Sequence, residues 1–195
     1  MEKIELKPAS VFHYFEEICK VPRPSKKEEK IIAYLMKFAE EQGLEAKKDE
    51  AGNILIKKAA TPGKENLKTV ILQSHIDMVC EKNSDSNHDF LNDPIETYID
   101  GEWLKAKGTT LGADNGIGMA TQLAVLAAND IEHGPLECLF TVDEETGLTG
   151  AFALKEGFMD GDTLINLDSE DEGELFIGCA GGANTTAEFA YEEID

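Results

Sequence analysis

Apolar residues recur along this chain at two different spacings, one typical of helices and the other of buried strands. Over residues 8–20 and 25–43 they recur every three or four residues, which predicts two amphipathic helices. Ser25 and Glu28 form the S-x-x-E pattern of a capping box, so we expect the second helix to begin at Ser25. Gly43 predicts its end, because glycine readily adopts the left-handed conformation that follows many helices.

Short apolar runs bounded by turns predict the strands of a sheet. Such runs occupy residues 44–59 (two strands around a turn at 51–53), 69–79, 101–108, 136–142, 162–167 and the tail, 174–195. Two further helices are expected, over residues 115–128 and 149–156. Strands that alternate with helices in this way predict an α/β fold with a mostly parallel central sheet flanked by helices.

Composition narrows the range of partners. The 195 residues are 42% hydrophobic, which is enough for one sizeable core. The 18 basic and 39 acidic residues give a net charge of −21, which repels phosphate backbones and anionic membranes. We therefore expect neither nucleic acid nor a membrane as a partner. The opening segment, MEKIELKPAS, lacks the apolar stretch of a signal peptide, so a cytoplasmic protein is expected.

Four polar groups stand directly after apolar strands or in a glycine-rich turn. They are His75 with Asp77, Asp114 in GADNG, residues 143–145 in FTVDEETG, and Asp168 in INLDSED. Ligands of open α/β sheets bind beyond the carboxyl ends of the strands, so these groups are expected to meet at one edge of the sheet.

Each group also has an ordinary structural explanation. His75 alone suits a hydrogen-bonded core histidine, Asp114 a helix cap, and Glu144 and Glu145 a solvated turn. Together they favour a metal site, because clustered carboxylates are costly unless a cation compensates them. An imidazole with several carboxylates suits zinc, cobalt or manganese. Asp77 can accept a hydrogen bond from the second ring nitrogen of His75 and so orient the ligand.

Four motifs carry a resemblance to a known family. They are SHIDMV (74–79), TTLGADNGIGMA (109–120), FTVDEETGLTGA (140–151) and INLDSEDEGELFIGCAGG (165–182). In wording and order they resemble the co-catalytic metallopeptidases of the M20 family, and most closely the branch of aminoacyl-histidine dipeptidases, or cytosol non-specific dipeptidases. The resemblance implies a catalytic domain of the di-metal exopeptidase type that hydrolyses dipeptides, Xaa-His and related ones.

The resemblance also implies a role for each site residue. His75, Glu145 and Asp168 would bind two divalent metal ions, and Asp114 would bridge them. These ions are expected to be zinc, with cobalt and manganese as alternatives. Asp77 would orient His75. Glu144 would be the general base that takes a proton from the attacking water and passes it to the leaving amine.

The resemblance further implies that the chain is part of a longer enzyme. Residues 1–186 would be the N-terminal part of the catalytic domain, and 187–195 the start of an inserted lid and dimerisation domain. The family has one more metal-binding histidine, but His13, His88 and His133 lie outside the matching motifs. We therefore expect little peptidase activity from this chain alone, and a homodimer for the full-length protein.

Two other functions remain open from the sequence. One is a different hydrolase with the same metal site, such as a deacetylase or aminoacylase, because the residues that select substrate would lie mostly outside this chain. The other is a non-catalytic acidic module that binds cations or a protein partner through a solvated face.

Overall fold

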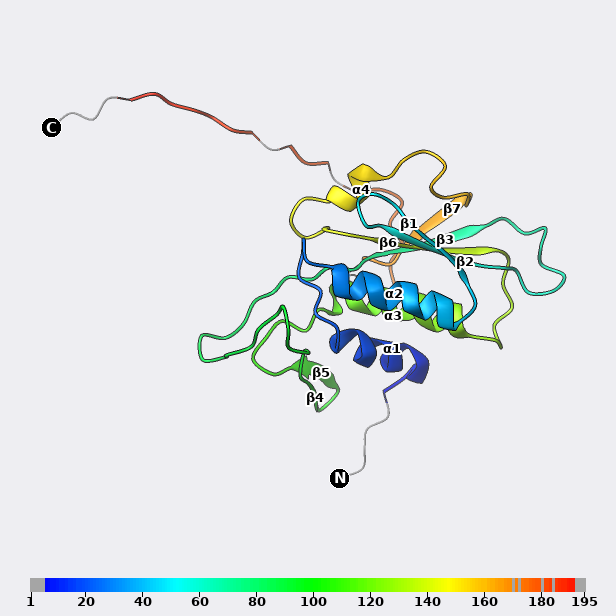
Figure 1. Ribbon diagram of the computed structural model, residues 1–195, viewed down its shortest axis with the longest axis horizontal. Coiled ribbons are helices and arrows are strands. Elements are labelled where there is room, and N and C mark those ends of the chain that lie inside the picture. Colours follow the sequence, from blue (N-terminus) through cyan, green and yellow to red (C-terminus); the bar gives the residue numbers. More distant parts are fainter. Residues whose placement is uncertain (1–5, 170, 172, 180, 184, 192–195) are drawn as a thin grey trace.

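A central sheet of five strands, in the order β1-β2-β6-β3-β7, organises the protein in this computed structural model (Figure 1). The structure describes residues 6–169, 171, 173–179, 181–183 and 185–191. The strands of the central sheet are β1 (Glu45–Lys48), β2 (Ile54–Lys58), β3 (Val70–His75), β6 (Leu136–Thr141) and β7 (Thr163–Asn166).

The direction of the strands confirms the expected sheet. Strand β3 pairs in parallel with β6 on one side and β7 on the other. Strand β2 is antiparallel to both β6 and β1, so it alone runs against the direction shared by the other four strands of this sheet. The carboxyl ends of β3, β6 and β7 therefore lie at the same edge of the sheet. The polar groups that follow these strands in the sequence begin at this edge.

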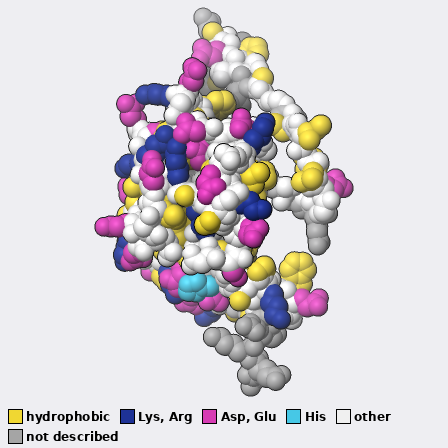
Figure 2. Space-filling view, turned by 90° about the vertical axis from the view of Figure 1, so that its right-hand side faces the viewer, with side chains coloured by type: hydrophobic (Ala, Val, Ile, Leu, Met, Phe, Trp, Pro, Cys, Tyr) yellow, Lys and Arg dark blue, Asp and Glu magenta, His cyan; other side chains and the backbone are white. Residues whose placement is uncertain are grey.

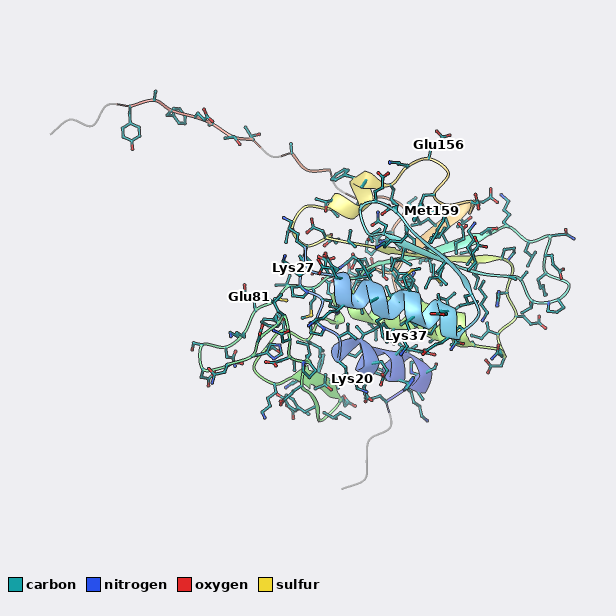
Figure 3. The ribbon with its side chains drawn as sticks, in the orientation of Figure 1. Lys20, Lys27, Lys37, Glu81, Glu156 and Met159 are labelled. Atoms are coloured by element: carbon teal, nitrogen blue, oxygen red, sulfur yellow. The ribbon has the colours of Figure 1, made fainter. Side chains whose placement is uncertain are left out.

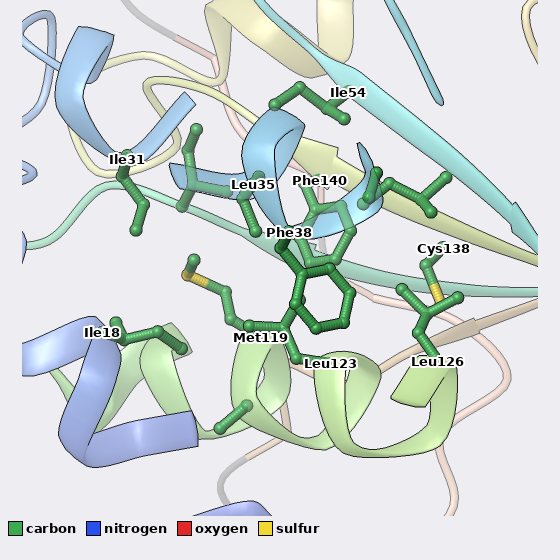
Figure 4. Close-up of a cluster of buried hydrophobic side chains, with 14 of the residues drawn as sticks. Ile18, Ile31, Leu35, Phe38, Ile54, Met119, Leu123, Leu126, Cys138 and Phe140 are labelled. Atoms are coloured by element: carbon green, nitrogen blue, oxygen red, sulfur yellow. The ribbon is translucent and has the colours of Figure 1, made fainter. Parts of the chain in front are cut away.

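Three helices lie on one side of the sheet, and a short fourth helix lies on the other side (Figure 1). They are α1 (Ala9–Cys19), α2 (Glu29–Glu41), α3 (Ala113–Ala127) and α4 (Thr149–Ala153). The main core lies between the three helices and the sheet. Figure 4 shows Leu35 and Phe38 of α2, Met119 and Leu123 of α3, and Phe140 of β6 pointing into this shared space.

The opposite face of the sheet carries a smaller core. Leu55, Ile71 and Leu139 are buried there beneath Leu154, Phe158 and Met159 of the loop that follows α4. In Figure 3 the Met159 side chain points toward the sheet, whereas Glu156 of the same loop points away from it. Strand β7 closes this sheet with all of its residues exposed.

A separate hairpin lies outside the central sheet. It consists of β4 (Thr97–Asp100) and β5 (Trp103–Ala106), which pair in an antiparallel manner. The prediction of a strand within 101–108 is confirmed, but its partner β4 was not expected. The loop before the hairpin is attached to α1, because the Ile95 N–H donates to the Cys19 carbonyl at 2.8 Å.

Three local predictions are wrong. Helix α2 begins at Glu29, and no side chain caps it, because the Ser25 hydroxyl donates to Asp77 instead. Helix α4 ends at Ala153 rather than at residue 156. The described residues of the tail, from 174 to 191, lie in neither helix nor strand. In the first case a tertiary hydrogen bond competes with the local capping pattern for the same hydroxyl.

Acidic side chains are spread over the surface. On the face shown in Figure 2, Asp and Glu side chains lie at many places and are interspersed with Lys side chains. This distribution agrees with a well-solvated surface as the main reason for the net charge. Among the described residues, no helix combines the length and the apolar character needed to span a membrane.

Candidate metal centre

The predicted site residues come together at the carboxyl edge of the sheet. His75 is the last residue of β3, and Asp114 lies in the first turn of α3. Glu144 and Glu145 lie in the turn that follows β6, and Asp168 lies just beyond β7. The parallel strands thus deliver residues that are far apart in the sequence to one place, as the strand-end rule predicts.

His75 is the centre of this arrangement. Its side chain is 1% exposed, and its Nε2 lies 2.9 Å from Asp114 Oδ1 and 3.8 Å from Asp168 Oδ2. Its Nδ1 lies 3.3 Å from Asp77 Oδ1, within range of an ion pair but without the alignment of a hydrogen bond. Burial by itself lowers the pKa of His75, but the carboxylates of Asp77 and Asp114 outweigh that effect and raise it to about 9.

Two groups of potential metal ligands share His75. Ligand atoms of His75, Asp114 and Asp168 lie within 4.8 Å of one another, and so do those of His75, Glu144 and Glu145. The imidazole of His75 thus has two pairs of carboxylates close to it. Nitrogen and oxygen ligands of this kind suit zinc and the neighbouring divalent ions.

The pKa values of the two glutamates also favour a bound cation. Burial raises the pKa of Glu144, and the carboxylates of Asp168, Asp77 and Asp114 raise it further. The pKa of Glu145 is raised too, first by burial and then by the carboxylates of Asp114, Glu144 and Asp77. Carboxylates that crowd together repel one another unless a cation lies between them, so the donor set fits a divalent metal.

Asp77 is held in place more firmly than any other carboxylate of the site. It is 0% exposed, and its Oδ1 accepts the backbone N–H of Glu144 at 3.0 Å. Its Oδ2 accepts the N–H of Glu145 at 3.2 Å and the hydroxyl of Ser25 at 2.7 Å. Burial raises its pKa, but these hydrogen bonds and the neighbouring His75 lower it to about 2. Asp77 therefore joins the histidine strand to the glutamate turn.

Asp143 does not take part in the cluster around His75, although the sequence groups it with the two glutamates. Its φ of 49° turns the chain sharply, and its carboxylate accepts the hydroxyls of Thr146 and Thr149 inside the turn. It lies instead with Glu28 and Asp77 in a second group of carboxylates, all of them buried. Asp143 thus shapes the turn that presents Glu144 and Glu145.

Sequence reasoning missed several residues that support the site. Ser25 bonds Asp77, and the Oδ1 of Asn166 accepts the backbone N–H of Asp168 at 2.9 Å. Arg23 donates to the backbone carbonyls next to His75 and near Asp114. Arg23 and Ser25 belong to segment 21–25, VPRPS, which lies between the two helices predicted over 8–20 and 25–43.

Comparison with known proteins places this arrangement in a family. Residues 71–190 match peptidase family M20/M25/M40, which is more than half of the chain. The chain belongs to this family. The matched segment contains every predicted metal ligand and the predicted general base.

Several similar proteins are named as peptidases. The chain is 54% identical over 186 residues to the cytosol non-specific dipeptidase of Escherichia coli, a match that covers 95% of this chain and 38% of that protein. It is 59% identical to the crystal structure of aminoacylhistidine dipeptidase from Vibrio alginolyticus, with a TM-score of 0.84, over 86% of this chain and 34% of that one. An aminopeptidase from Bacillus cereus follows, at 27% identity and a TM-score of 0.71, over 83% of this chain and 43% of that one.

These matches bear on both the fold and the extent of the chain. They confirm the α/β fold and the M20 resemblance to the dipeptidase branch. The chain spans about 38% of the length of the related dipeptidase from Escherichia coli.

Proposed function

We propose that this chain is part of a metal-dependent dipeptidase that hydrolyses dipeptides, Xaa-His dipeptides among them. The observation that carries the proposal is the buried His75, whose two ring nitrogens face carboxylates from separate segments of the chain. The two relatives named as dipeptidases supply the substrate class.

His75, Asp114, Glu145 and Asp168 are the proposed metal ligands. They would hold two divalent ions with Asp114 between them, and zinc is the first choice, with cobalt and manganese as alternatives. When bound, such ions polarise a peptide carbonyl and lower the pKa of water. Asp77 accepts hydrogen bonds from both glutamate N–H groups and faces His75 Nδ1, so it fixes the ring against the turn.

Glu144 is the proposed general base. Its carboxylate lies near His75, and burial raises its pKa above that of an ordinary glutamate. A general base works best when its pKa approaches the working pH, so this environment suits proton transfer. Glu144 would accept a proton from the attacking water on its carboxylate oxygen and deliver it to the amine of the leaving residue.

The whole protein is proposed to extend beyond this chain. Residues 1–186 would form the N-terminal part of the catalytic domain and 187–195 the start of a lid and dimerisation domain, of which 192–195 lie outside the described residues. We propose that this chain alone has little activity and that the full-length protein is a homodimer. The related dipeptidase is named as a cytosolic protein, which supports a cytoplasmic location.

Two alternatives make different predictions. A deacetylase or aminoacylase of the same family would use the same ligands but would cleave an acyl group rather than a dipeptide. A non-catalytic acidic module would bind cations without any need for Glu144. A panel of dipeptides and N-acyl amino acids, assayed with the complete protein, separates the first alternative from the proposal.

Zinc titration by calorimetry tests the site, first on this chain and then on the complete protein. His75→Ala and Asp168→Ala should each abolish or strongly weaken binding. The exposed residues His13 and Asp162 provide matched controls, His13→Ala and Asp162→Ala, which should bind like the wild type. Equal affinity in all four variants of the complete protein, or a wild type that binds no zinc, would reject the metal site.

Activity is tested separately through the base. In the complete protein, Glu144→Gln should leave zinc bound and lower kcat for a dipeptide by about 100-fold or more, as expected for loss of a general base. If the wild type and this variant are both inactive, the non-catalytic module is favoured. If both are equally active, a residue other than Glu144 is the base.

A further inference from the structure

Arg23 is the one arginine among the 18 basic residues of this chain. Its side chain is 3% exposed, although the lysines lie mainly at the surface. Among the described residues its guanidinium forms no salt bridge with a carboxylate, and all of its hydrogen bonds go to backbone carbonyls. Burying a cation is costly. The cost raises the question of which segments of the chain the buried guanidinium connects.

The guanidinium joins the end of β3 to the start of α3. Its Nη1 donates to the carbonyls of Ile76 at 3.1 Å and Asp77 at 2.7 Å, directly after His75. Its Nη2 donates to the carbonyl of Gly112, just before the helix that begins with Asp114 in its first turn. One planar group therefore connects the two segments that carry His75 and Asp114.

The backbone around Arg23 strengthens this attachment. The Arg23 carbonyl accepts the N–H of Met78 at 3.2 Å, and Pro24 forms a parallel bridge with Met78. The hydroxyl of Ser25 bonds the carboxylate of Asp77. Segment 23–25 thus holds the exit of β3 through both its main chain and its side chains.

Two glycines of the GADNG motif leave room for the guanidinium. A Cβ at Gly112 would lie 2.6 Å from Arg23 Nη2, and one at Gly116 would lie 2.8 Å from the same atom. Gly112 also has a φ of 72°, which side chains rarely adopt. The glycines on either side of Asp114 therefore fit the shape of the arginine, independently of its hydrogen bonds.

We propose that Arg23 is a positioning residue that sets the separation of His75 and Asp114, and thereby the geometry in which these two ligands meet a metal. The inference rests on the metal site proposed above. Arginine suits the role because its Nη atoms donate in two fixed directions, whereas lysine offers one compact ammonium on a flexible stem. Lysine at this position keeps the charge but cannot span both segments in the same way.

The test uses the complete protein and four variants. Arg23→Lys and Arg23→Met change the guanidinium, and Gly116→Ala crowds it while keeping the arginine. Lys58→Met is the matched control, because Lys58 is a partly buried cation that also donates to backbone carbonyls, those of Val125 and Ala128, at the far end of α3. Thermal unfolding of the metal-free protein and competition of zinc against a chromophoric chelator are measured for each variant.

The proposal expects zinc affinity to fall by about 10- to 100-fold in both Arg23 variants and in Gly116→Ala, the range typical of residues that orient metal ligands. Lys58→Met should lower Tm while its zinc affinity stays within about twofold of the wild type. Cobalt gives an independent readout. The visible absorption bands of the cobalt-loaded protein should shift in Arg23→Lys and stay unchanged in Lys58→Met.

Wild-type zinc affinity and cobalt bands in Arg23→Lys and Gly116→Ala would overturn the proposal, whatever happens to Arg23→Met. It would also be overturned if zinc affinity fell only in proportion to Tm, because that result is expected of a residue that stabilises the fold without positioning the ligands. Failure of the metal site itself is distinguishable, because then the wild type and Lys58→Met would bind no zinc either.

Discussion

The hydroxyl of Ser25 donates a hydrogen bond of 2.7 Å to the carboxylate of Asp77, across 52 residues of sequence. Asp77 in turn faces His75 Nδ1 and accepts the N–H groups of Glu144 and Glu145. A loop between two helices is thus part of the support of the proposed metal ligand. This relationship makes the contribution of Ser25 measurable by removal of a single oxygen atom.

Ser25→Ala should destabilise the protein by about 2 kcal/mol, the usual contribution of a hydrogen bond to a charged group. It should also lower kcat/KM of the complete enzyme by about 10-fold, because Asp77 loses one of the bonds that orient it. Chemical denaturation and dipeptide kinetics measure the two effects. Ser84→Ala, at an exposed loop position, is the control and should change neither quantity. Equal effects in both variants would contradict the role of Ser25.

Gly150 lies against the backbone at the start of the glutamate turn. A Cβ at this position would lie 2.4 Å from the Val142 carbonyl oxygen and 2.5 Å from Asn53 Oδ1. Gly150→Ala should therefore displace the turn that carries Glu144 and Glu145. We expect a loss of about 2 kcal/mol or more in stability, as for other overpacked sites, together with weaker zinc binding.

The control for this variant lies three residues earlier. At Gly147 an added Cβ would meet only Thr149 Cγ2, at an ordinary 3.7 Å. Gly147→Ala should therefore leave stability within about 0.5 kcal/mol, as is usual for surface positions, and zinc affinity unchanged. The comparison uses denaturation and calorimetry. If Gly150→Ala behaved like Gly147→Ala, the close packing at Gly150 would not control the turn.

Much of the fold follows from apolar periodicity. Strands β3 and β6 lie where apolar runs predict them, and helices α1 and α3 lie close to their predicted bounds. One face or more of each of these elements is buried, so the spacing of its apolar residues indicates whether it is a helix or a strand. Strand β4 was missed because its sequence, TYID, is largely exposed and carries no apolar alternation. The tail was expected to be strand because it contains apolar residues, but a strand also needs a neighbour to pair with.

The candidate site could be predicted to a similar extent, and for a related reason. The rule that ligands gather beyond the carboxyl ends of strands was sufficient to bring His75 and Asp168 together. The residues that support the site could not be predicted from the sequence, because their roles depend on tertiary contacts. Ser25 fits a local capping pattern equally well, and Arg23 acts on carbonyls 53 to 89 residues away.

Glu28 is a buried carboxylate close to the site. It is 6% exposed and shares a small volume with the buried carboxylates of Asp77 and Asp143. Burial raises the pKa of Glu28 above its ordinary value near 4.5, and the charge of Asp77 raises it further. Glu28→Gln removes this charge, while its amide oxygen can still accept the N–H groups of Lys26 and Asp143.

The sign of the pH dependence follows from that shift. A carboxyl group whose pKa is raised by folding destabilises the fold once it ionises, so its cost appears as the pH rises from 4.5 through the higher folded value. Glu28→Gln should therefore be about 1 kcal/mol more stable than the wild type at pH 7 and nearly equal to it at pH 4. Urea denaturation at the two pH values measures the difference. Glu40→Gln, at an exposed position of α2, should show no such difference, and a variant less stable at pH 7 would contradict the argument.

Metal binding should stabilise the folded protein, because the ligands lie close together only when β3, α3 and β7 are assembled. A ligand that binds only the folded state at 100 times its Kd adds about 2.7 kcal/mol to the free energy of unfolding. We expect zinc to raise Tm of the wild type and a chelator to reverse the change. Glu144→Gln should keep most of this stabilisation, because the base is not a proposed ligand, whereas His75→Ala should lose it. Thermal scans with and without zinc measure all three proteins, and an equal rise in Tm for His75→Ala would show that zinc stabilises the fold from another place.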